Sequence, residues 1–114
     1  MGNISEDLRG IYEFKSDFFD VGQFVISKGV RNLIGTKYNE AEFVFGSIVR
    51  YCRKDWGDLS EKDALINEEE IARNNGNMSL FACYQSEYGK IYISTNRISE
   101  AGEYATTVFL PGER

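Results

Sequence analysis

The stretch from residue 39 to residue 54 constrains the fold most, because its apolar side chains recur with the period of an α-helix. Asn39 begins the stretch as a candidate N-cap, and basic residues gather at its end, where they complement the helix dipole. The apolar side chains that fall on one stripe of such a helix are Ala41, Phe45, Ile48 and Cys52. The pattern predicts an amphipathic helix over residues 39–54 that packs one face against a core.

A second helix is predicted over residues 60–74. Ser60 and Asp63 approximate a capping box, and the run Asn74-Asn75-Gly76 is a typical helix end. Four apolar side chains are expected on its core face: Ala64, Leu65, Ile71 and Ala72. The joint between the two helices holds the chain's only tryptophan, Trp56, followed by Gly57, which allows a tight turn.

The remaining segments are typical of β-structure and one short helix. Residues 21–27 predict a buried strand, and Ser27 is a candidate cap for a helix over residues 28–35. Two strands on either side of a four-residue loop at 86–89 predict a hairpin, with Ile91 and Ile93 on one face. A last strand over 105–111 ends at Pro111, which belongs at a sheet edge or a terminus.

These elements predict an α+β fold with two or three helices packed on a small, mainly antiparallel β-sheet. A length of 114 residues and a hydrophobic content of 42% suffice for one domain with one core. We expect residues 1–20 to form a partly ordered N-terminal arm, with a strand over 11–14. Residues 21–114 are expected to form a single α+β domain.

The chain contains no histidine, and this excludes several kinds of chemistry. Catalytic Ser-His and Cys-His pairs are impossible, and two isolated cysteines without an imidazole do not make a zinc site. Cys52 and Cys83 are therefore interpreted as small buried hydrophobes in a reducing cytoplasm. No signal peptide and no apolar run of about 18 residues is seen. We expect a cytoplasmic protein without a membrane span, a cofactor, a metal or an enzymatic activity.

Acidic side chains concentrate between residues 55 and 70, a segment with seven acids and one base, Lys62. The net charge of the whole chain is −5. This segment is either a solvated helix face or a surface that meets a basic protein partner. Trp56 is either a plug in the core or a binding hot spot. The candidate interaction surface is Asp55, Trp56, Asp58, Glu61, Glu68 and Glu69.

Two other functions stay open from the residues alone. Asp55, Asp58 and Glu61 are close enough in sequence to hold a divalent metal in an enzyme, since Mg²⁺ asks for few carboxylates. Arg50, Arg53 and Lys54 are a thin basis for a DNA-binding accessory factor, and direct nucleic-acid binding is not expected from an acidic chain. Exposed aromatic side chains and a strand edge near the C-terminus leave a homodimer open.

Two passages, "DWGDLSEKDALINEEEI" and "ATTVFLPGE", resemble an uncharacterised family of small proteins from plasmids, phages and integrative elements. The family shares a G-D-W-G-D-L core and an A-T-T-x-x-L-P ending, and the resemblance covers residues 21–112. This chain departs from the pattern at Lys54, where the family has glycine, and at Glu103-Tyr104. Some members are named for a restriction–modification subunit, but this chain has no methyltransferase or nuclease motif.

The resemblance implies a mobile-element accessory protein. Such proteins help the element to survive in its host, and some of them are acidic inhibitors of restriction or CRISPR systems. We therefore expect a non-enzymatic protein that binds another protein, with a host defence nuclease or complex as the partner class.

Overall fold

A computed structural model of the chain describes residues 14–113. It confirms an α+β fold, with three helices and a four-stranded mixed sheet. In chain order the elements are β1 (Gln23–Ile26), α2 (Lys28–Thr36), α3 (Tyr38–Cys52), α4 (Glu61–Arg73), β2 (Ser79–Ser86), β3 (Gly89–Arg97), β4 (Tyr104–Phe109) and a 3₁₀ turn η1 (Pro111–Glu113). Of the strand predicted over 11–14, residues 11–13 lie outside the described part, and Phe14 is not in a strand.

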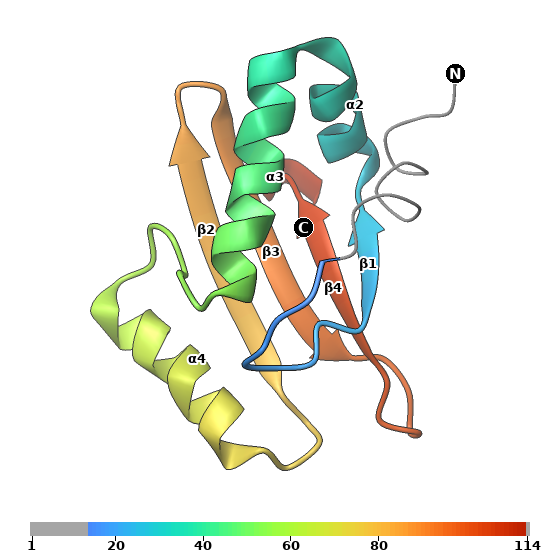
Figure 1. The fold of residues 1–114 in the computed structure, drawn as a ribbon, viewed down its shortest axis with the longest axis vertical. Helices are drawn as coiled ribbons and strands as arrows, with labels where there is room; N and C mark the ends of the chain where they lie inside the picture. The colour runs from blue at the N-terminus through green and yellow to red at the C-terminus, as the bar shows by residue number, and fades with distance from the viewer. Residues whose placement is uncertain (1–13, 114) are drawn as a thin grey trace.

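The sheet has the strand order β1-β4-β3-β2, with α2 and α3 over one face and α4 beside β2 (Figure 1). The β2–β3 and β3–β4 pairs are antiparallel, whereas β1 pairs with β4 in parallel. The last strand is therefore an inner strand, and the edge expected near the C-terminus is not found there. The reason is that β1 adds to the sheet beyond β4.

The β2–β3 hairpin turns more tightly than the sequence indicated. Ser86 and Gly89 pair with each other in the ladder, so only residues 87 and 88 lie outside it. Gly89 takes a φ of +118°, a conformation that L side chains rarely adopt. The glycine thus lets β3 begin immediately after a two-residue turn, and the predicted four-residue loop is wrong.

Helix α3 begins at Tyr38 rather than after Asn39. Its N-cap is Lys37, which makes no side-chain capping bond, so the prediction of an Asn39 cap is wrong. Lys37 is also the single residue between α2 and α3, and its extended backbone (φ −145°) makes the turn between them. The predicted apolar stripe does face the core, where Ile48 and Cys52 are buried and Ala41 and Phe45 are partly buried.

Helix α4 differs from its predicted packing. The Ser60 cap is confirmed, since the Asp63 backbone N–H donates to Ser60 Oγ at 3.2 Å. Ala64 and Ile71 pack against the core as predicted, but Leu65 is 61% exposed and Ala72 is also exposed. The helix lies beside the edge strand β2 and not over the middle of the sheet, so only a narrow side of it meets the protein (Figure 1).

A chain of buried hydroxyls crosses the core between α3 and the sheet. Tyr51 Oη lies 2.6 Å from Thr95 Oγ1, Thr95 Oγ1 lies 2.7 Å from Thr106 Oγ1, and Thr106 Oγ1 donates to the carbonyl of Val21 at 2.6 Å. A carbonyl only accepts, so the direction of every bond is fixed: Thr95 donates to Thr106, and Tyr51 donates to Thr95. Burial raises the pKa of Tyr51, which keeps its hydroxyl a donor.

The described part of the N-terminal arm crosses the helical side of the sheet (Figure 1). The Phe19 ring lies 5.5 Å from that of Tyr51 and 5.9 Å from that of Trp56. Ser16 Oγ donates to the carbonyl of Cys52 at 2.7 Å, at the end of α3. Residues 14–20 therefore form part of the packed structure.

Candidate functional site

Trp56, at the joint between α3 and α4, is a core residue. Its side chain is 6% exposed, and its ring centroid lies 5.4 Å from that of Tyr51 in an edge-to-face arrangement. The indole Nε1 donates to Glu68 Oε2 at 2.8 Å, which gives the buried N–H its partner. Of the two readings that the sequence left open, the geometry matches the core plug.

The joint lies against the outer edge of β2 and needs a glycine there. Gly57 has a φ of +74°, and a Cβ at this position would come within 2.1 Å of the Cys83 carbonyl oxygen. The next residue, Asp58, donates its backbone N–H to the same carbonyl at 2.7 Å. The close approach of the two backbones explains the Trp-Gly-Asp order at this point.

Polar side chains from the joint and from α4 bond along the outer edge of β2. The Asn67 side chain donates to the Phe81 carbonyl at 2.8 Å and accepts from the Phe81 N–H at 3.2 Å. Asp58 Oδ2 accepts from the N–H of Gln85 at 2.8 Å, and Glu70 Oε1 accepts from the N–H of Ser79 at 3.0 Å. These bonds occupy backbone groups that an added strand would use, so this edge is protected from pairing.

Several of the acids between 55 and 70 therefore serve the fold. Asp55 accepts two hydrogen bonds from the Arg50 guanidinium, at 2.7 and 3.1 Å, and this partner lowers the pKa of its carboxyl. Glu68 holds both Trp56 and the Lys54 ammonium, the latter at 3.0 Å. Of the six candidate surface residues, Asp55, Trp56, Asp58 and Glu68 thus have contacts within the chain.

Glu61 and Glu69 differ from the other candidates. Both are exposed on α4, and neither side chain has a bonding partner among residues 14–113. Asp63, on the same helix, has an exposed carboxylate of the same kind. Three exposed carboxylates therefore lie together on this helix, whereas other exposed acids, such as Glu42 and Glu87, lie on other elements.

The side chains proposed for a metal site and for DNA binding are engaged in contacts of the same kind. Asp55 and Asp58 bind a guanidinium and a backbone N–H, and residues 14–113 contain no group of three potential ligands placed to hold a metal ion. Arg50 lies over the Tyr84 ring at 5.1 Å, and Lys54 lies over that of Phe18 at 4.8 Å, so two of the three basic residues at this joint are engaged.

Cys52 and Cys83 are free thiols and both are buried, as predicted. Burial raises the pKa of Cys52 to about 11 and also raises the pKa of Cys83. At neutral pH both therefore stay protonated, and a thiol is a poor nucleophile compared with a thiolate.

Helix α4 exposes apolar side chains beside the predicted acidic ones, and this apolar part of the surface was not predicted. Leu65 is 61% and Ile66 is 48% exposed, although Leu65 was expected in the core. We call this surface the outer face of α4, and it consists of Glu61, Lys62, Asp63, Leu65, Ile66 and Glu69. The signal that could have revealed it is the pair of adjacent apolar residues, because one narrow buried stripe cannot accept both.

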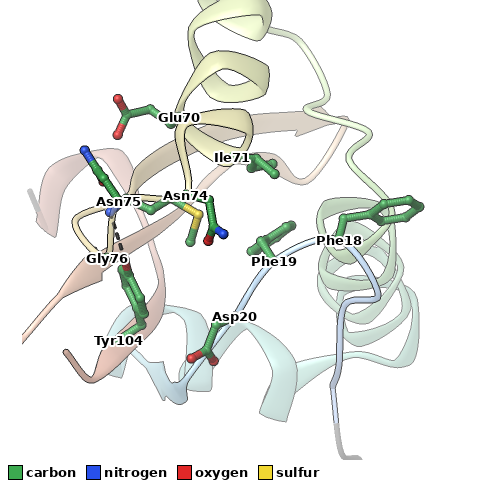
Figure 2. A pocket seen from close by; sticks show the side chains of 10 residues that line it. Phe18, Phe19, Asp20, Glu70, Ile71, Asn74, Asn75, Gly76 and Tyr104 are labelled. Atoms are coloured by element: carbon green, nitrogen blue, oxygen red, sulfur yellow. Dashed lines mark hydrogen bonds between the residues drawn. The ribbon is translucent and has the colours of Figure 1, made fainter.

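A cavity of about 230 Å³ lies between the N-terminal arm and the end of α4 (Figure 2). Phe19, Ile71 and Met78 supply its apolar lining. Its polar groups mostly serve the fold, since Tyr104 Oη accepts from the Met78 N–H at 2.9 Å and Glu70 binds Ser79 and Arg73. The volume is below the roughly 300–1,000 Å³ of typical ligand pockets.

Comparison with protein-family models, with curated proteins and with solved structures finds no match to this chain. The resemblance to the mobile-element family therefore stays a prediction. None of the helices in residues 14–113 is long and apolar enough to span a membrane.

Proposed function

We propose that this protein is a non-enzymatic accessory protein that acts by binding another protein through α4. The observation that carries the proposal is a set of three exposed carboxylates on α4 that accept no hydrogen bond and form no ion pair within residues 14–113: Glu61, Asp63 and Glu69. Other acids of the same segment bind backbone groups or basic side chains, so their presence has a structural reason. The carboxylates of these three have no such partner within residues 14–113, although Glu61 and Asp63 also lie in the first turn of α4, where an acid favours the helix N-terminus.

The charge of this surface defines the partner. A chain of net charge −5 with free carboxylates on one helix attracts a basic surface and repels nucleic acid and anionic lipid. Such attraction raises the association rate and disfavours wrong partners, and it weakens as salt is added.

The partner class follows from the family that the chain resembles. Some acidic proteins of mobile elements inhibit host defence complexes by occupying basic grooves that otherwise bind DNA or RNA. We infer that this chain is an anti-restriction or anti-CRISPR inhibitor of that kind, with α4 at the groove.

The test is affinity capture of the tagged chain from host lysate, with mass spectrometry to identify the bound protein. The double variant Glu61→Lys/Glu69→Lys is expected to lower capture at least about tenfold, because it reverses the charge of the surface. The matched control is Glu100→Lys/Glu103→Lys, the same charge change on exposed residues of the β3–β4 loop. Equal capture by the two double variants, or no captured partner at all, contradicts the proposal.

A further inference from the structure

Two large apolar side chains, Leu65 and Ile66, lie exposed side by side on the outer face of α4. Single exposed apolar residues are ordinary in proteins and need no explanation. Tyr38 and Ile98 are of this kind, whereas Val49 lines a hollow with Phe18, whose ring lies under the Lys54 ammonium. Leu65 and Ile66 differ because they are adjacent and share their face with free charges.

The spacing along α4 puts carboxylates on both sides of Leu65. Glu61 lies four residues before it and Glu69 four residues after it, so all three side chains follow one line along the helix. Lys62 is the one basic residue of the outer face, and the nearby Arg73 is paired with Glu70. An apolar centre flanked by acids therefore covers the outer side of the helix.

The helix is already formed in the free protein. Ser60 caps its start, Asn74 closes it in a left-handed conformation, and Asn67 fixes it to β2. A preformed helix loses little conformational entropy when it binds, which favours recognition of the helix as a unit.

We infer that the outer face of α4 docks into a groove of the partner that has an apolar floor and a basic rim. Leu65 and Ile66 contact the floor, and Glu61 and Glu69 meet lysine or arginine side chains on the rim. This inference rests on the proposed function and names the chemistry of the partner's surface. The charge of the helix face excludes a nucleic acid or an anionic membrane as the occupant.

Two synthetic peptides serve as probes of this chemistry: an amphipathic helix made of leucine and lysine, and an oligolysine of equal charge. Binding to the full chain is measured by calorimetry, and the contacted residues are located by NMR chemical-shift changes. The unaltered protein is expected to bind the leucine–lysine peptide at least about tenfold more tightly than oligolysine, with shift changes on α4.

The variants separate the apolar contribution from the charge. Leu65→Gln/Ile66→Gln is expected to remove the tenfold difference between the peptides, and Glu61→Lys/Glu69→Lys to weaken binding of both. The control Val49→Gln/Ile98→Gln removes exposed apolar side chains elsewhere and is expected to bind like the unaltered protein. All these positions are exposed, so an unchanged melting temperature shows that each variant is folded.

The inference is overturned if Leu65→Gln/Ile66→Gln keeps the tenfold difference, or if the shift changes fall outside α4. Capture from lysate then distinguishes the two proposals. If the charge reversal abolishes capture of the partner and Leu65→Gln/Ile66→Gln does not, the proposed function is supported and the inference of an apolar groove is contradicted. If both variants still capture the partner, both proposals are contradicted.

Discussion

Gly57 occupies a position where any side chain would strike the neighbouring strand. Its φ of +74° already disfavours other residues, and the 2.1 Å approach of a Cβ to the Cys83 carbonyl adds a direct clash. Gly46, in the middle of α3, has the opposite setting, because nothing lies within 4 Å of a Cβ placed there. Gly57 is therefore required by the packing of the joint against β2, whereas no neighbouring atom requires a glycine at position 46.

The variant Gly57→Ala is expected to lower the free energy of unfolding by at least about 2 kcal/mol, through backbone strain and the clash with β2. Gly46→Ala is expected to raise it by up to about 1 kcal/mol, because alanine is the better helix former. Urea denaturation at neutral pH measures both. A Gly57→Ala variant as stable as the original protein would show that the joint moves freely away from β2.

Thr106 holds the buried hydroxyl chain to Val21. The variant Thr106→Val leaves the Val21 carbonyl without its donor and the Thr95 hydroxyl without its acceptor, so we expect a loss of about 1–3 kcal/mol in stability. Thr107→Val, on the other face of β4, is the matched control and is expected to change stability by less than about 0.5 kcal/mol. An equal loss of stability in the two variants would contradict a stabilising role for the buried hydroxyl chain.

At the scale of elements, α4 acts as a cover for the edge of the sheet. Its one fully buried residue is a polar one, Asn67, which is 3% exposed and bonds both backbone groups of Phe81. An apolar residue there would leave the two groups unpaired. The packing of this helix thus depends on hydrogen bonds to the strand edge as well as on the apolar contacts of Ala64 and Ile71.

We expect Asn67→Ala to cost about 1–3 kcal/mol in unfolding free energy and to increase self-association at high concentration, because the edge of β2 becomes available. Denaturation and sedimentation velocity measure the two effects. Glu69→Ala, two residues further on and on the exposed side of the helix, is the control and is expected to leave both properties unchanged. A stable, monodisperse Asn67→Ala protein would show that the edge is protected by other means.

For the molecule as a whole, Glu113 ties the end of the described chain to the start of α2. Its carboxylate accepts from Ser27 Oγ at 2.5 Å, from the Gly29 N–H at 2.9 Å and from the Leu110 N–H at 2.8 Å. These bonds, that of Ser27 first, lower the pKa of Glu113. The bonds from Ser27 and Gly29 join residues 86 and 84 positions apart in sequence, so they close a long loop of chain.

The lowered pKa makes this tie dependent on pH. A carboxyl with a lower pKa in the folded state stabilises the protein above its unfolded pKa of about 4.3, and the stabilisation is lost as pH falls through the folded value. Glu113→Gln should therefore be less stable than the original protein at pH 7, and the difference should shrink toward zero in strong acid. Denaturation from pH 7 to pH 2 measures it, and a difference that stays constant would contradict the charge-based role.

Much of the secondary structure follows from local sequence. The stripe from Ala41 to Cys52 predicts α3, Ser27 and Ser60 cap their helices as expected, and Ile91 and Ile93 face the core. These features depend on neighbours within a few residues, which the sequence shows directly. The start of α3 was misplaced because Lys37 turns between two packed helices, and a sequence carries no direct signal of that packing.

The amino-acid sequence by itself determined the α+β class, the core side of α3 and the chemistry that a chain without histidine cannot perform. Only the tertiary structure decided that β1 pairs in parallel with β4, that Asn67 is buried and that Leu65 is exposed. It also decided which acids serve the fold, because Asp58 and Glu70 find their partners on β2, 27 and 9 residues further along the chain. The physical reason is that a side chain's burial and bonding depend on which segments pack against its element, and this packing is set by the whole chain.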